Sequence, residues 1–204
     1  MLLIALRIFL YALLLSISAL IVFADAYQLQ SAEESFTEMA QEFILLLMVV
    51  IGIYEGRSAK HYKTFIFFLA SISSVFLVRE FNNYLTDEVF DGAWQTIALI
   101  LILVATYYFF KKRKQLKDQI LALKESGPFA LIMMGGLQLI VFSRIYGNKN
   151  IWKNFMGEDY LRMIKEVSEE SIELMAYAVI FIGFMELIFL SRKIDRKQKS
   201  EPTH

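Results

Sequence analysis

The residues whose types and spacing suit chemistry form two acidic stripes. Their members recur every three or four residues, and they are Glu34, Glu38 and Glu42 in one stripe and Glu166, Glu170 and Glu173 in the other. Residues with this spacing lie on one face of a helix. Like charges repel one another there, so protons, a cation or arginines must offset them.

These acids predict a site for a hard cation or for protons. Carboxylate oxygens suit Ca²⁺, Mg²⁺ or Mn²⁺, and crowded carboxylates suit proton coupling. We expect Glu38, Glu42, Glu170 and Glu173 to be the ligands or proton carriers, with a divalent cation as the candidate cofactor. The sequence has no cysteine and 2 histidines, one at its end and one in a basic loop. This excludes a thiolate site and a bis-histidine haem or zinc site within the membrane for one chain.

Five further residues are expected near the same level of the membrane, where they would tune the site. Arg79 and Glu80 end one apolar block, Arg144 ends another, Gln95 lies near the start of a third, and Tyr177 continues the second acidic stripe. Ionisable residues inside a membrane face the bundle interior and are candidates for function. Because acids outnumber bases in this cluster, we favour a binding site.

A structural role for the same residues is the competing interpretation. Glu42 and Glu173 would then pair with Arg79 and Arg144 and lock the helices together. Charged pairs in a low dielectric are costly to form and costly to break, so such a network would hold the fold without binding anything.

Apolar blocks must position these residues. The chain has 204 residues, of which 57% are hydrophobic, which is too apolar for a soluble domain of this size. The blocks predict an all-α, polytopic membrane bundle of six transmembrane helices, at residues 5–24, 38–57, 64–80, 92–110, 126–144 and 170–190. We expect residues 1–204 to form one membrane domain. The second and sixth blocks are short, so Glu42 and Glu173 must enter the membrane if these helices cross it.

Charge segregation predicts the orientation of the chain. The connections around residues 57–63 and 111–124 and the tail at residues 192–204 are basic, whereas the acids gather on the opposite side. Cytoplasmic loops carry an excess of Lys and Arg, so both termini should be cytoplasmic, in an inner or plasma membrane. The acidic stripes should then lie near the outer face. Glu55 and Glu186 lie on another helix face, and we expect them to snorkel to the cytoplasmic boundary.

Three weaker patterns each have two interpretations. Residues 38–55 and 169–186 share their acid spacing, which indicates either a parallel repeat of helical hairpins 1–2 and 5–6 or chance. Residues 24–26 resemble a signal-cleavage site, so the first helix is either a span or a signal. Residues 111–127 are either an amphipathic helix lying on the membrane or a solvated linker.

Three classes of function fit the sequence. The first is a protein that binds or moves a hard cation or protons, such as a transporter. The second is a non-catalytic membrane subunit or sensor whose polar cluster docks a partner. The third is an intramembrane enzyme acting on a lipid headgroup, which we disfavour because no catalytic motif is present. The expected partners are the bilayer and either another membrane protein or further copies of this chain, and not a nucleic acid.

Overall fold

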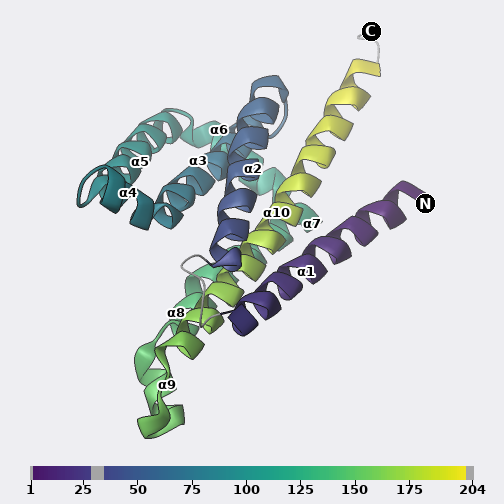
Figure 1. Ribbon diagram of the computed structural model, residues 1–204. Helices are drawn as coiled ribbons and strands as arrows, with labels where there is room; N and C mark the ends of the chain where they lie inside the picture. Colours follow the sequence, from purple (N-terminus) through teal and green to yellow (C-terminus); the bar gives the residue numbers. More distant parts are fainter. Residues whose placement is uncertain (1, 29–34, 201–204) are drawn as a thin grey trace. The chain divides into compact units, whose positions relative to one another are not determined.

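The computed structural model describes residues 2–28 and 35–200, and these ranges are helical throughout most of their length (Figure 1). No strand occurs in the described ranges, so the predicted all-α class is confirmed. The elements in chain order are α1 (Leu2–Gln28), α2 (Phe36–Ser58), α3 (Lys63–Glu80), α4 (Asn82–Glu88), α5 (Ala93–Lys111), α6 (Arg113–Leu123), α7 (Gly127–Leu137), the π-helix η1 (Gln138–Phe142), α8 (Ser143–Tyr146), α9 (Lys149–Met156), the 3₁₀-helix η2 (Gly157–Asp159) and α10 (Arg162–Ser200). Glu34 of the first acidic stripe and residues 201–204 of the basic tail lie outside the described residues.

Five stretches of helix within the described residues are long and apolar enough to cross a membrane. They are Ile4–Tyr27, Phe36–Ser58, Ala93–Lys111, Gly127–Tyr146 and Arg162–Lys199. Each of them contains most or all of one predicted span. The prediction of several membrane-length helices is therefore confirmed for these five blocks.

The sixth predicted span, residues 64–80, is not among them. The helix itself is present as α3, which has 18 residues and begins at Lys63. At about 1.5 Å per residue it is about 27 Å long, which is close to the thickness of a bilayer core. Arg79 and Glu80 occupy its last turn, so charges at both ends shorten its apolar part. Six spans are thus not confirmed, and neither are the side of the termini and the hairpin repeat.

The chain packs as two compact units. The first unit comprises Met1–Gln41 and Leu131–Ile182, and the second comprises Glu42–Ala130 and Gly183–His204. The boundaries fall within α2, α7 and α10, so each unit contains part of these helices. The predicted single membrane domain stays a prediction.

The first unit is centred on the N-terminal half of α10. Leu174, Ala176, Tyr177 and Ala178 are all fully buried there. Gly135 of α7 lies so close to α10 that a Cβ atom on it would be 2.6 Å from Cγ1 of Ile180. Glycine at such a position allows two helix backbones to approach closely. The π-helix η1 then follows α7 without a break and leads into α8.

The second unit contains a helical hairpin in which α3 and α5 lie side by side, joined by α4 (Figure 1). Aromatic rings line this contact, with the Phe68 and Phe109 centroids 5.3 Å apart. Residues 113–123 form the helix α6, which confirms the helical interpretation of that loop. Its Leu123 is fully buried in the protein, so this apolar side chain packs inward, and the contact of α6 with the membrane stays a prediction.

Candidate carboxylate site in the first unit

The start of α2 is capped by an acid from a different helix. Asp25 of α1 accepts hydrogen bonds from the backbone N–H groups of Phe36 (3.0 Å) and Thr37 (2.7 Å). It also accepts hydrogen bonds from the hydroxyls of Ser35 (2.8 Å) and Thr37 (2.5 Å). The first N–H groups of a helix have no partner within the helix, and a carboxylate there also interacts favourably with the helix dipole. Asp25 is only 6% exposed, so it fastens α1 to the N-terminus of α2.

Glu170 of α10 lies beside this cap. Its Oε2 atom accepts one long hydrogen bond from the hydroxyl of Ser35 (3.4 Å). The side chain of Gln41 donates to the backbone oxygen of Glu170 (3.0 Å), which fastens α2 to this turn of α10. Glu38 of the first stripe and Asp25 are both close enough to repel the charge of Glu170, as is Glu166. Within the described residues, Glu170 has no basic partner.

Glu173 lies one turn further along α10 and is 6% exposed. Its Oε1 atom accepts a hydrogen bond from the hydroxyl of Ser143 (2.6 Å), which is buried and directly follows η1. π-Helical turns are rare within α-helices and are frequent at functional sites. Tyr177 follows on the same helix and is fully buried, and its part in tuning the site stays a prediction.

The outermost acids of α10 are offset by bases of the same helix. Arg162 Nε lies 2.5 Å from Glu166 Oε1, and Lys165 Nζ lies 2.7 Å from Glu169 Oε2. Both pairs have the four-residue spacing that favours ion pairs on a helix. The sequence interpretation overlooked these bases, although that spacing was a signal that could have identified them.

The remaining predicted site residues are divided between the two units. Arg144 is exposed in α8 of the first unit. Arg79 and Glu80 belong to the second unit, where their side chains pair with each other at 2.8 Å. Gln95 is exposed in α5 and Glu42 is half-buried in α2, and both also belong to the second unit. A part for these residues in the carboxylate site stays a prediction.

The described residues contain no group of three or more acidic or histidine side chains placed to hold a metal ion. A divalent cation held by the predicted glutamates stays a prediction. The site in the first unit is a cluster of carboxylates around Glu170, with hydroxyls and an amide beside it.

The second unit corrects one expectation. Glu55 was expected to snorkel to a membrane boundary, but it is 4% exposed and both of its oxygens accept hydrogen bonds from Arg192 of α10. A buried carboxylate must be paired, and the guanidinium supplies two parallel donors. The prediction for Glu55 was wrong because its partner is distant in the sequence and no local spacing indicates it.

No protein-family model, curated protein or solved structure matches the chain. The fold and the site together define an all-helical protein with membrane-length helices and a half-buried carboxylate cluster.

Proposed function

We propose that this chain is a multi-pass membrane protein in which the carboxylates of the first unit bind a proton or a hard cation, with Glu170 at the centre. The observation that carries the proposal is the environment of Glu170. Within the described residues, its carboxylate accepts one hydrogen bond, which is long, and has no basic partner, while three acids repel its charge. A half-buried carboxylate in such surroundings is stabilised when a proton or a cation offsets its charge.

The proposed topology follows from the charges of the chain. It has six spans, with α3 as the additional one, and both termini on the cytoplasmic side of an inner or plasma membrane. The excess of Lys and Arg at one set of helix ends supports this orientation. The carboxylate cluster then lies near the outer face, where protons and cations have access from outside.

A proton fits the site better than a divalent cation. Ca²⁺ takes six to eight oxygen ligands, and Mg²⁺ requires near-octahedral coordination. The described residues show no set of three acids arranged for this. We assign the carboxylates of Glu38 and Glu173 to the same site as Glu170.

A structural role is the second candidate, and one observation favours it for part of the cluster. Asp25 accepts hydrogen bonds from two backbone N–H groups and two hydroxyls, which is what holding two helices together requires. The two roles divide by residue. Asp25 holds α1 and α2 together, and Glu170 binds the proton or cation.

Thermal unfolding of the full chain in detergent tests the proposal. The wild type, Glu170→Gln and the control Glu158→Gln are compared over a pH series. They are then compared with Ca²⁺, Mg²⁺ or Mn²⁺ added at constant ionic strength. Glu158 is exposed in η2 of the same unit, so the control removes one charge without touching the cluster.

We expect the thermal stability of the wild type and of Glu158→Gln to depend on pH or on one of the cations in a way that Glu170→Gln does not share. A ligand at 100 times its Kd stabilises the folded state by about 2.7 kcal/mol, which sets the size of the effect for a cation. The proposal is wrong if Glu170→Gln retains the full dependence. If Glu170→Gln unfolds the protein under all conditions, the structural interpretation replaces it.

A further inference from the structure

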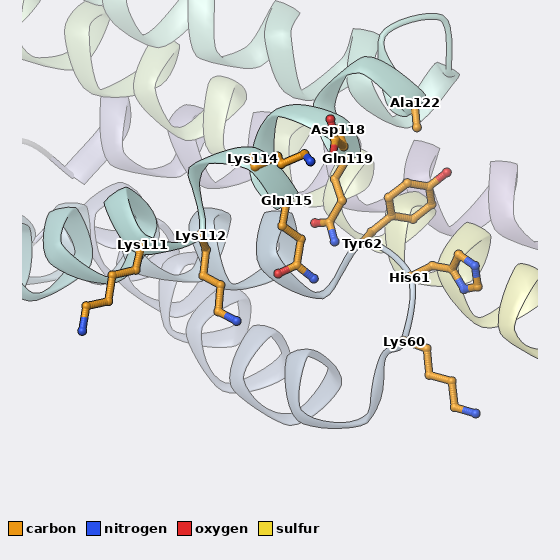
Figure 2. A pocket seen from close by; sticks show the side chains of 10 residues that line it. All are labelled: Lys60, His61, Tyr62, Lys111, Lys112, Lys114, Gln115, Asp118, Gln119 and Ala122. Atoms are coloured by element: carbon orange, nitrogen blue, oxygen red, sulfur yellow. The ribbon is translucent and has the colours of Figure 1, made fainter.

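A basic groove lies in the second unit. It encloses about 540 Å³. Its lining residues come from the loop before α3 and from the end of α5 through α6 (Figure 2), and they are Lys60, His61, Tyr62, Lys111, Lys112, Lys114, Gln115, Asp118, Gln119 and Ala122. Two segments that are distant in the sequence thus form one site.

The groove carries an excess of positive charge. Four of its lining residues are lysines, namely Lys60, Lys111, Lys112 and Lys114, and Asp118 is the one acid among them. Within the described part of the chain, none of these lysines lies within ion-pair distance of a carboxylate. Lys111 Nζ instead lies 4.4 Å from the centroid of the Tyr107 ring. Four lysines around one groove, with a single acid among the lining residues, favour the binding of an anion.

Two side chains, those of Asp195 and Gln119, hold the backbone around the groove in place. Asp195 of α10 accepts hydrogen bonds from the backbone N–H groups of Lys60 (3.1 Å) and His61 (3.3 Å), and it also pairs with the His61 ring. Gln119 of α6 accepts a hydrogen bond from the N–H of Phe65 in the first turn of α3 (2.9 Å). The groove is therefore formed before any ligand binds, which reduces the entropy lost on binding.

The location of the groove indicates the kind of anion. Lys111 is the last residue of α5, and α5 is one of the helices long enough to cross a membrane. Basic residues directly after a span lie at the level of lipid phosphates and attract anionic headgroups. Lysine binds phosphate as a compact point charge with three donors, and Gln115 and Tyr62 add polar groups that are able to donate hydrogen bonds.

We propose that this groove binds a phosphate-bearing anion, and that its source is the headgroup of an anionic lipid. The assignment rests on α5 crossing the membrane, but it does not depend on the carboxylate site. The lipid would hold the loop of residues 60–62 and the helix α6 against the bilayer surface.

Binding of lipids to the purified full chain tests the assignment. Native mass spectrometry in detergent measures the binding of phosphatidylglycerol, with phosphatidylcholine as the neutral lipid and inorganic phosphate as the free anion. The variant Lys112→Gln/Lys114→Gln removes two charges that line the groove. The matched control Lys117→Gln/Lys124→Gln removes two charges from α6 and the residue after it, which do not line the groove. Lys60→Gln, in the other segment, is a second and independent groove variant.

We expect phosphatidylglycerol to bind the wild type and the control alike, and to bind Lys112→Gln/Lys114→Gln about 30-fold more weakly, since each lysine contributes about fivefold near an anionic surface. Lys60→Gln should bind about fivefold more weakly by the same reasoning. Equal weakening in the control and the groove variants would overturn the site, because it would indicate diffuse attraction to the basic surface. Equal binding of phosphatidylcholine would also overturn it. Displacement of phosphatidylglycerol by equimolar inorganic phosphate would overturn the lipid as the source.

Discussion

Asp25 is the residue whose substitution should reveal the packing of the first unit most clearly. Its carboxylate serves as the N-cap of α2 although it belongs to α1. The substitution Asp25→Ala removes the carboxylate that accepts hydrogen bonds from the N–H groups of Phe36 (3.0 Å) and Thr37 (2.7 Å). Thr37 N–H then keeps only its longer bond to the hydroxyl of Ser35 (3.2 Å). Asp25→Asn keeps one oxygen but turns an amide NH₂ toward one of these donors. The two substitutions therefore remove different numbers of bonds at the same position.

The magnitudes follow from these bonds. Removing an N-cap costs about 0.5–2 kcal/mol, and a hydrogen bond to a charged group contributes about 1.5–3 kcal/mol. Asp25→Asn loses one backbone bond to the charged carboxylate, so we expect a loss of about 2 kcal/mol in the free energy of unfolding. Asp25→Ala loses both backbone bonds in a buried place, so we expect a loss of about 3–4 kcal/mol.

Equilibrium unfolding in detergent measures both losses. Asp159→Asn is the matched control, because Asp159 is an exposed acid of η2 in the same unit, and its unfolding free energy should equal that of the wild type within about 0.5 kcal/mol. The order of stability should be wild type, then Asn, then Ala at position 25. The reasoning fails if Asp25→Ala is as stable as the control, since the cap would then contribute nothing.

Two further predictions test the helix packing, one in each unit. In the first unit, Gly135→Ala should lower the free energy of unfolding by about 1–3 kcal/mol, because the new Cβ would be 2.6 Å from Ile180 Cγ1. The control Gly136→Ala should change it by less than about 1 kcal/mol, because its Cβ would meet nothing within 4 Å. Equal effects at the two glycines would contradict the close helix contact. In the second unit, Arg192→Met should lower the free energy of unfolding by about 2–3 kcal/mol. This is less than for a fully buried pair, because the Arg192 side chain is 50% exposed. Adding Glu55→Gln should restore part of the loss, because it removes the carboxylate left without its partner. Chemical unfolding of single and double variants measures this, and no recovery in the double variant would argue against the pair.

The fold class could be predicted because long apolar blocks dominate the chain. Membrane-length helices need only composition and length, and both are visible in the sequence. The extent of α10 was not predicted, since the helix begins at Arg162, well before its apolar part. Ion pairs such as Lys165 with Glu169 stabilise that polar turn. The third predicted span forms a helix, α3, as its apolar residues predicted, but the charges at both of its ends shorten its apolar part below membrane length.

The candidate site was predictable only along single helices. Helical spacing put Glu170, Glu173 and Tyr177 on one helix, and all three belong to α10. It also identified Glu38 of α2, whose charge acts on Glu170. It could not indicate that Asp25 of α1 caps another helix, because a cap is normally sought beside the helix it serves.

Partners that are far apart in the sequence were also missed. The hydrogen bond from Ser143 to Glu173 joins two helices, and the pair of Glu55 and Arg192 joins residues that no periodicity relates. Such contacts depend on how helices pack, which the sequence pattern of one helix does not contain.

The central claim is that Glu170 holds a proton or a cation, and carbon-13 NMR of the glutamate carboxyl carbons tests it most directly. The full chain is labelled at these carbons in detergent, and Glu170→Gln and Glu158→Gln assign the two signals. We predict that the Glu170 signal titrates at a pH clearly different from that of the Glu158 signal, or that it alone shifts on addition of one of the three divalent cations. If the two signals titrate together and no cation separates them, Glu170 is an ordinary solvated carboxylate and the account is contradicted.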